Sequence, residues 1–514
     1  MRRISLFLFL SVSIIAICNT SCVHKPQIPP VYGGFPDSVG KIFLTKCTNA
    51  GCHNAASYHN AAELQLDTWE HLFNGGISGA VVVAHSAKYS PLLYYINAHD
   101  SSDLIAWDPA HIASPLSLKE YTTIKNWIAS GAPDSNGNIP FAANPDTRQK
   151  IYLTNQGCDL IAVIDGKSKL VMRYIPIGMD PGNPEAPHDV AISADGRYGY
   201  VPLFSGDYLQ KFDTRTDTII SSLNIGTYTS DPATRGNGGW SLLSFSPQDT
   251  AIMVSGYAAQ GYALCVNTAT MQVNTQLSVT SSNGPSPLFL FPHGIASNPT
   301  FDTFYSTLQY GNAIIKYSFR PFFPSYISVN GMPIGTLGDS SNHATPNPHQ
   351  ILMLPDHSRY FVTCQQTGMV SVFDTRGITH SDTLIAQIPV GKYPQEMDIS
   401  LSKGYLFVAC MTDPSNPPPH LGTVYVIDYN TLVVKTILKG DFYEPHDVAV
   451  DDQDGLLYIP SRNADATGIP SHHATACGGN AGWYSVYDLN TLQPADNKRY
   501  EVTNDPYAIS ARFK

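Results

Sequence analysis

From Gln149 to the end of the chain, the sequence repeats itself with a period of roughly 50 residues. Each unit contains four short apolar runs. The first begins with Pro, the second ends in a Tyr-Val-Thr-Asn-like run, the third is similar to Val-Ser-Val-Ile-Asp, and the fourth ends near Ile-Pro-Val-Gly. Four short strands repeated at this spacing are typical of a β-propeller, in which each unit forms one blade.

The number of blades follows from counting the first strands. They begin at Pro187, Gly239, Pro292, Pro348, Pro394, Pro445 and Pro506. The repeat starts in mid-unit, because Ile151–Asn155 is a second strand and Leu160–Asp165 a third, while the last unit supplies only a first strand, Ala508–Phe513. The two ends of the repeat region therefore complete one blade together and leave no exposed edge. We predict an all-β, seven-bladed propeller over residues 149–514.

These repeats resemble the bacterial YVTN-type β-propellers, and the resemblance covers about residues 149–514. Related propellers include scaffolds of redox enzymes such as nitrous oxide reductase. A fold alone does not assign a function, so function has to be argued from particular residues.

Before the repeats lies a short motif that carries its own chemistry. Cys47, Cys52 and His53 provide two thiols and an imidazole directly after the second thiol, which is what covalent haem attachment requires. Four residues separate the thiols in this chain, where two are usual. The alternatives are a disulfide or a zinc site, but zinc would need two further close ligands, and His59 and His71 do not pair in that way.

The surroundings of this motif, residues 36–135, resemble the small all-α cytochrome c domains of bacterial exported proteins, especially lipoproteins. The features that carry the resemblance are a helix over Val39–Lys46, the segments Leu64–Asp67 and Ser90–Tyr94, and a last amphipathic helix with Tyr121, Ile124, Trp127 and Ile128 on one face and Ser117 and Glu120 as a capping box. The resemblance implies one haem c, bound through Cys47 and Cys52, with His53 on the iron.

This chain differs from that family at the position of the second axial ligand. The family places a Met-Pro pair before the last helix, whereas this chain has no Met between Met1 and Met172 and has Ala106–His111 at the matching place. Either a second His binds the iron or the position is open. His111 is the best-placed candidate, followed by His99 and His85. Ligation by two histidines would lower the redox potential relative to His/Met ligation.

A second group of histidines belongs to the repeats. Four first strands begin with Pro-His, and the equivalent places in the other three hold Trp240, Gln395 and Tyr507; the four histidines are His188, His293, His349 and His446. First strands line the central channel of a propeller. Two long loops on the same face carry His420 and, between Ser461 and Gly482, His472 and His473. We expect all seven histidines around one mouth of the channel.

Neutral imidazoles suit Cu, Zn, Fe or Ni, so this set is a candidate metal site. It resembles the His-ringed copper centre of nitrous oxide reductase, which implies copper. That centre uses seven histidines, however, and only four in this chain belong to the ring. The alternative is structural: Pro shapes the turn into the strand, and the next residue is polar because the channel is wet.

Two smaller features accompany the histidines. Asp189 and Asp447 follow two of them and could orient imidazoles, although alternation along a strand directs neighbouring side chains to opposite sides. Cys158 and Cys477 fall in loops of adjacent blades, where a disulfide is possible in an oxidising compartment. The five cysteines after residue 53 are too scattered and odd in number for a disulfide scaffold.

The N-terminus reads as an export signal. Arg2 and Arg3 precede an apolar run, Ile4–Ile17, and Cys22 follows, so residues 1–22 resemble a bacterial lipoprotein signal with Cys22 as the lipidated residue. Cys18 is a weaker alternative, and a simple secretory signal is another. We expect a periplasmic or surface protein tied to a bacterial membrane only through its lipid. Residues 136–148 read as a linker between the two domains.

These features favour electron transfer, with a redox partner protein and an oxidoreductase centre or small-molecule substrate site at the His-lined mouth. The alternative is a recognition propeller with the haem as relay or sensor. A purely structural role leaves the haem motif unexplained. The net charge of −11 argues against a nucleic-acid partner, because phosphates would be repelled.

Overall fold

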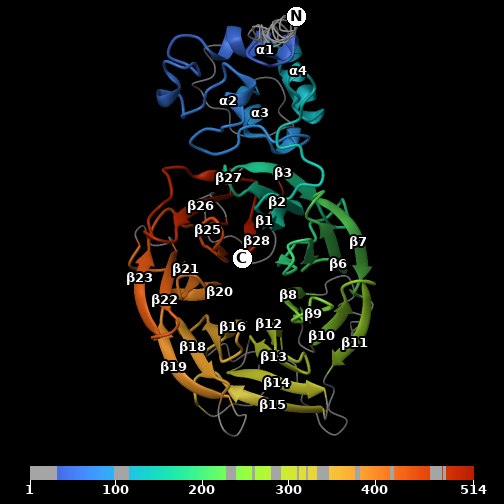
Figure 1. Cartoon of the computed structure of the whole chain (residues 1–514), viewed down its shortest axis with the longest axis vertical. Coiled ribbons are helices and arrows are strands. Elements are labelled where there is room, and N and C mark those ends of the chain that lie inside the picture. The colour runs from blue at the N-terminus through green and yellow to red at the C-terminus, as the bar shows by residue number, and fades with distance from the viewer. Residues whose placement is uncertain are drawn as a thin grey trace, which may run out of the picture.

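The protein folds into a small helical unit beside a ring of β-sheets (Figure 1). The computed structural model describes residues 32–97, 115–226, 239–257, 261–278, 291–309, 312–319, 322–332, 346–376, 382–416, 422–462, 477 and 482–514. The ring is made of seven four-stranded antiparallel sheets, which confirms the predicted seven-bladed propeller.

Each blade places its four strands in order from the channel axis outward. The seven blades are β28 (Pro506–Ala511), β1 (Lys150–Asn155), β2 (Leu160–Asp165), β3 (Val171–Pro176); β4 (Ala191–Ile192), β5 (Tyr198–Pro202), β6 (Tyr208–Asp213), β7 (Thr218–Asn224); β8 (Trp240–Phe245), β9 (Ala251–Gly256), β10 (Tyr262–Asn267), β11 (Gln272–Ser278); β12 (Pro292–Ser297), β13 (Thr303–Leu308), β14 (Ala313–Phe319), β15 (Phe322–Ser328); β16 (Pro348–Met353), β17 (Arg359–Cys364), β18 (Met369–Asp374), β19 (Thr383–Pro389); β20 (Lys392–Ser400), β21 (Tyr405–Thr412), β22 (Thr423–Asp428), β23 (Val433–Leu438); and β24 (Ala449–Asp451), β25 (Leu456–Ser461), β26 (Gly482–Asp488), β27 (Tyr500–Val502).

The ring closes by pairing its two ends. In the closing blade, β28 from the C-terminus is hydrogen-bonded to β1, with Ile151 opposite Ala511 and Leu153 opposite Ile509. The last strand therefore supplies the innermost strand of the blade that β1–β3 began, as the mid-unit start of the repeats predicts. The C-terminus lies inside the ring as a result (Figure 1).

Burial explains why the strands differ in sequence. The middle strands β1 and β2 are buried at every residue, because neighbouring blades cover both faces of each sheet. The outermost strand β7 instead alternates between exposed and half-buried residues, since its outward side chains meet solvent. The continuous apolar runs and the alternating runs of each repeat therefore mark its inner and outer strands.

A left-handed residue precedes the first strand of every blade. Seven residues have a positive φ of 46° to 57°: Ala186, Gly239, Phe291, Asn347, Tyr393, Glu444 and Asp505. Six of them stand directly before a Pro, which begins β12, β16 and β28, lies within β20 and precedes β4 and β24, so this corner recurs around the whole ring. The left-handed residue therefore sets the register of each inner strand relative to the turn before it.

The sequence places Trp240 at the position of the ring histidines, and the geometry of this corner shows that this assignment is wrong. Trp240 directly follows the left-handed Gly239 and pairs with Gly256, just as Pro292 pairs with Leu308 in the next blade. Trp240 therefore occupies the Pro position, and Ser241, not Trp240, is equivalent to the ring histidines.

The helical unit has its own apolar core, built from residues between Phe35 and Ala132. Its elements are α1 (Asp37–Ile42), the π-helix η1 (Phe43–Cys47), η2 (Tyr58–Asn60), α2 (Trp69–Leu72), η3 (Ala87–Tyr89), α3 (Pro91–Ile96) and α4 (Leu118–Ala129). Helix α4 buries the apolar face predicted from the sequence, and Ser117 with Glu120 forms the expected capping box. Among the described residues, every helix is too short or too polar to cross a bilayer.

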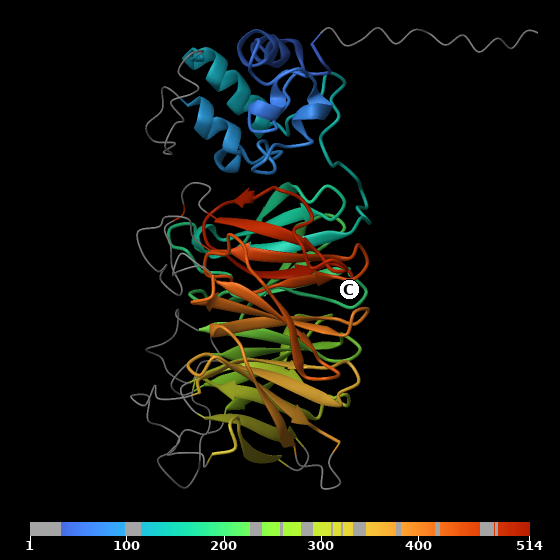
Figure 2. The ribbon, with the colours of Figure 1, turned by 90° about the vertical axis from the view of Figure 1, so that its left-hand side faces the viewer.

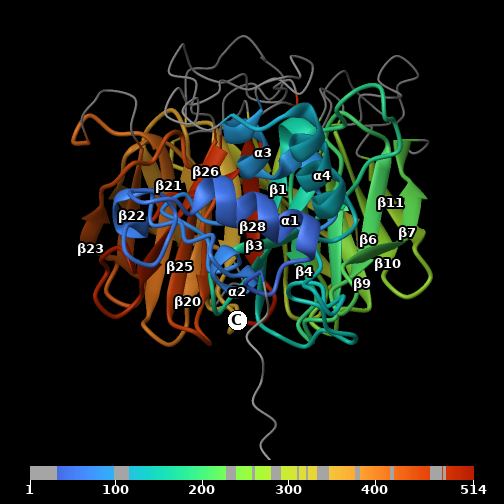
Figure 3. The same cartoon turned by 90° about the horizontal axis from the view of Figure 1, so that it is seen from above.

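The helical unit packs against the rim of the propeller, beside β3 and β27 (Figure 1). Figures 2 and 3 show the same unit at one side of the ring. The amides of Arg499 and Glu501 donate hydrogen bonds to the carbonyls of Ile77 (3.1 Å) and Ser78 (2.9 Å). Ala80 and Val83 of the unit are buried in one apolar cluster with propeller residues. The unit therefore covers the outer edge of β27, and it does not lie over the channel.

A disulfide joins Cys158 to Cys477 across 319 residues, at the bond predicted as possible between adjacent blades. Cys158 ends the short helix η5 (Gln156–Cys158), which links β1 to β2. The hydroxyl of Tyr89, in the helical unit, lies 3.7 Å from the Cys477 sulfur. The disulfide thus lies where the closing blade, its neighbour and the helical unit meet.

Candidate haem site and candidate metal centre

The Cys47–His53 motif forms one compact loop at the end of η1. The loop is closed by the amide of His53, which donates to the carbonyl of Cys47 (3.0 Å), and by the Asn54 side chain, which donates to the carbonyl of Asn49 (2.7 Å). At Gly51 φ is +82°, and nothing lies within 4 Å of where a side chain would begin. The four-residue spacer therefore bulges outward while the two cysteines and the histidine stay together.

The imidazole of His53 is oriented by the backbone. Its Nδ1 lies 3.0 Å from the carbonyl oxygen of Leu64, and the His53 carbonyl accepts a hydrogen bond from the amide of Leu66 (2.8 Å). An imidazole that donates from Nδ1 to a carbonyl presents Nε2 as its metal-binding nitrogen. This is the arrangement that suits an axial haem ligand.

The two thiols are free in this structure and are not bonded to each other. Cys47 packs against the core of the helical unit, and burial, followed by the nearby Cys52, raises the pKa of its thiol to about 12. Among the described residues, the two thiols belong to no group of three close His, Cys, Asp or Glu side chains, although a structural zinc ion needs four ligands. Free thiols and an oriented imidazole fit a haem c better than a zinc ion.

The second axial ligand stays a prediction. His111 and His99 lie outside the described residues. His85 is exposed, and its Nδ1 is 3.4 Å from the carbonyl of Ala129 at the end of α4.

Inside the propeller, the four predicted ring histidines meet. All four are buried, and their ring centroids are separated by 3.8 Å for His293 and His349, 5.1 Å for His188 and His293, 5.5 Å for His349 and His446, and 6.3 Å for His188 and His446. The loop histidines His420, His472 and His473 lie outside the described residues. The four ring histidines therefore lie together, and the gathering of all seven around one mouth stays a prediction.

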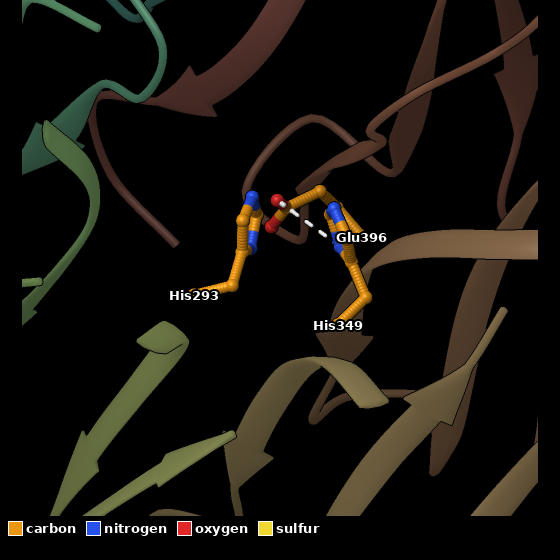
Figure 4. Close-up of side chains that lie close together, drawn as sticks. All are labelled: His293, His349 and Glu396. Carbon is orange, nitrogen blue, oxygen red and sulfur yellow. Dashed lines mark ion pairs between the residues drawn. The ribbon is translucent and has the colours of Figure 1, made fainter. Parts of the chain in front are cut away.

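The four histidines divide into two groups. His293 and His349 stand beside the carboxyl group of Glu396, and one ligand atom from each of these three residues lies within 4.8 Å of the other two (Figure 4). His188 and His446 instead contact Tyr507, whose hydroxyl lies 3.2 Å from Nε2 of His188 and whose ring stacks on His446 at 3.7 Å. The ring is therefore not symmetric.

Glu396 was not found from the sequence, although a signal existed. It follows the ring residue Gln395 just as Asp189 and Asp447 follow ring histidines, so three blades have an acid at the same register. The side chain is 5% exposed, and burial, followed by the charges of Asp447 and Asp189, holds its pKa well above the usual value.

Asp189 and Asp447 join neighbouring blades. The Asp189 carboxylate accepts a hydrogen bond from the amide of Leu243 (2.8 Å), and that of Asp447 accepts one from the amide of Ile509 (2.8 Å). Each bond links one inner strand to the next. Burial raises the pKa of Asp189 to about 6. Their described hydrogen bonds go to backbone amides, which accounts for these residues without any role in orienting imidazoles.

A buried ion pair supports Tyr507 from behind. The guanidinium of Arg462 donates to both carboxylate oxygens of Asp505 at 2.6 and 2.9 Å, and both side chains are fully buried. The same guanidinium lies 5.0 Å from the centre of the Tyr507 ring. Tyr507 is thereby held between a cation and the histidines.

Comparison with known proteins gives one family match. The model of a family described as Planctomycete cytochrome C matches residues 50–104, a segment that contains Cys52 and His53. No curated protein matches the sequence.

Two solved structures are similar in part. One is a functionally unknown protein from Desulfotomaculum acetoxidans, with 11% identity and a TM-score of 0.48 over 70% of this chain and 100% of that chain. The other is hydrazine synthase from Kuenenia stuttgartiensis, with 15% identity and a TM-score of 0.40 over 57% of this chain and 80% of that chain.

Proposed function

We propose that this chain is an exported c-type haem protein that transfers electrons, with one haem bound covalently to Cys47 and Cys52 and ligated by His53. The observation that carries the proposal is the hydrogen bond between His53 Nδ1 and the Leu64 carbonyl, next to two free thiols. The family match over residues 50–104 supports the same cofactor. A haem c would carry one electron by cycling between Fe(II) and Fe(III).

The proposed location is the periplasm or the cell surface of a bacterium, with Cys22 lipidated. The Cys158–Cys477 disulfide supports it, because disulfides persist in oxidising compartments and are rare in the cytosol. The proposal treats residues 36–135 as a cytochrome c-like domain, 136–148 as a linker and 149–514 as a YVTN-type propeller.

Electrons would be exchanged with a separate redox protein at the helical unit. This unit lies at the rim of the propeller (Figure 2), so a partner would dock on it from outside the ring. The propeller would hold the substrate or second centre of an oxidoreductase at its histidine cluster.

The test is expression of the full chain in a host with the c-type haem maturation machinery. We expect the wild type to keep its colour after extraction with acidified acetone and to show the mass of chain plus one haem. The double variant Cys47→Ala/Cys52→Ala should be colourless and of apo mass. Cys265→Ala is the matched control, because it removes a buried propeller thiol and should leave haem content unchanged. An apo mass for the wild type would overturn the proposal.

A further inference from the structure

We propose that His293, His349 and Glu396 bind one divalent first-row transition-metal ion inside the propeller channel. The three residues come from the inner strands of three consecutive blades, β12, β16 and β20. The site specifies the second centre that the proposed function places at the histidine cluster, and it does not depend on the haem.

The geometry is close to that of a bound site. One ligand atom from each residue lies within 4.8 Å of the other two, and Nδ1 of His349 is 4.0 Å from Oε1 of Glu396 (Figure 4). Ligand atoms about 2.0–2.1 Å from one tetrahedral zinc ion would be roughly 3.4 Å apart. Small side-chain rotations therefore bring all three onto one ion without moving a strand.

The ligand types select the class of metal. Two imidazoles with one carboxylate suit Zn, Fe or Cu, whereas Ca²⁺ and Mg²⁺ require oxygen ligands. His293, His349 and Glu396 are at most 5% exposed. Three protein ligands leave a further coordination position, which is the arrangement of catalytic rather than closed structural sites. A ligand or substrate entering the channel would bind there.

One carboxyl oxygen at the site also lacks a hydrogen bond. Oε1 of Glu396 accepts none from the described residues, although the side chain is only 5% exposed. A buried polar atom is costly unless it is hydrogen-bonded or coordinated, and a metal ion would supply the missing partner.

The backbone holds the ligands in place. The His293 carbonyl accepts a hydrogen bond from the Ser255 hydroxyl (2.6 Å), and the His349 carbonyl accepts one from the Thr307 hydroxyl (2.6 Å). The amide of Glu396 donates to the carbonyl of His446 (3.0 Å). Each bond joins one blade to its neighbour, so the site is built on rigid elements that keep its ligands close before any ion binds.

The experiment uses the full, haem-matured chain without a polyhistidine tag. The protein is treated with a chelator, loaded separately with zinc, cobalt or copper chloride, and desalted. Metal per chain is measured by mass spectrometry, with the haem iron counted separately. The variants are His349→Ala and Glu396→Gln, and the control is His357→Asn, a propeller histidine in a turn away from the channel.

We expect the wild type and His357→Asn to bind about one ion per chain besides the haem iron. His349→Ala and Glu396→Gln should bind more weakly by at least about 100-fold, since losing even an outer-shell partner costs 10–100-fold. Glu396→Gln keeps the shape of the side chain, so it decides the question if His349→Ala fails to fold. The Cys47→Ala/Cys52→Ala chain should still bind the ion, which separates this site from the haem motif.

Three results would overturn the site. They are a wild type that takes up none of the three metals, variants that bind as tightly as the wild type, and loss of the ion in the Cys47→Ala/Cys52→Ala chain. A wild type that takes up no metal would instead favour the recognition role considered for the propeller.

Discussion

The hydroxyl of Tyr507 lies 3.2 Å from Nε2 of His188, so the last strand of the chain contacts a histidine of the first complete blade. Burial holds the pKa of Tyr507 well above its usual value of 10, so the phenol keeps its proton and can donate it to the imidazole. Tyr507 therefore fixes one of the two histidines that do not face Glu396.

Tyr507→Phe tests this relationship. Removal of the hydroxyl should lower the free energy of unfolding by about 1–3 kcal/mol, because a buried imidazole nitrogen loses its hydrogen bond. Metal uptake should stay at the wild-type level, since Tyr507 is not among the proposed ligands. Urea unfolding and metal analysis measure the two effects. Tyr393→Phe, at a 43% exposed tyrosine, is the control and should change neither.

Loss of the disulfide should destabilise the propeller. Cys158→Ala/Cys477→Ala opens a link across 319 residues, and removal of a native disulfide costs about 2–5 kcal/mol. Denaturant unfolding of the variant and of the reduced wild type should give matching losses. A variant as stable as the oxidised wild type would contradict the structure at this bond.

The capping box of α4 should stabilise the helical unit. The Ser117 hydroxyl accepts a hydrogen bond from the amide of Glu120 (3.3 Å), and Ser117→Ala should cost about 0.5–2 kcal/mol. Thr123→Ala on the exposed face of the same helix is the matched control, and it should not destabilise the unit because Ala favours helix. Thermal unfolding followed in the haem absorbance would report on this unit alone. Equal midpoints for the two variants would count against the cap.

Asp159 should make stability depend on pH. Burial raises the pKa of its carboxyl group from 3.8 to about 6, so the folded state holds the proton more tightly than the unfolded state. The stabilising contribution is complete below about pH 4 and is lost as the pH rises through 6. Relative to Asp159→Asn, the wild type should lose about 1–3 kcal/mol between pH 4 and 6.5. Urea unfolding at both pH values measures this difference. An equal change in the free energy of unfolding for the two proteins would refute the prediction.

The sequence was enough to predict the architecture, because the repeat records each blade separately. The count of seven, the shared closing blade and the apolar face of α4 each follow from spacing alone. The register of Trp240 in its strand could not be predicted. It is set by the left-handed backbone at Gly239, and residues of several types adopt that conformation in the other blades. The contact of Ala80 and Val83 with the propeller could not be predicted either, because these two residues belong to no periodic pattern in the sequence.

The candidate metal site shows the same limit. His293 and His349 were found because Pro-His recurs, but Glu396 follows a Gln in its own repeat. Its approach to the two imidazoles depends on the curvature of the ring, which brings three inner strands together. An acid at one register in three blades was visible in the sequence. Which of the three acids turns toward the imidazoles was not.

The pairing of β28 with β1 has a consequence for the order of folding. Thr154 and Ala508 are hydrogen-bonded across this seam and lie 354 positions apart in the sequence. Contacts between residues so far apart form slowly, because the chain must first bring its distant segments together. We therefore expect the closing blade to form late, after the other blades have curved the chain into an open ring.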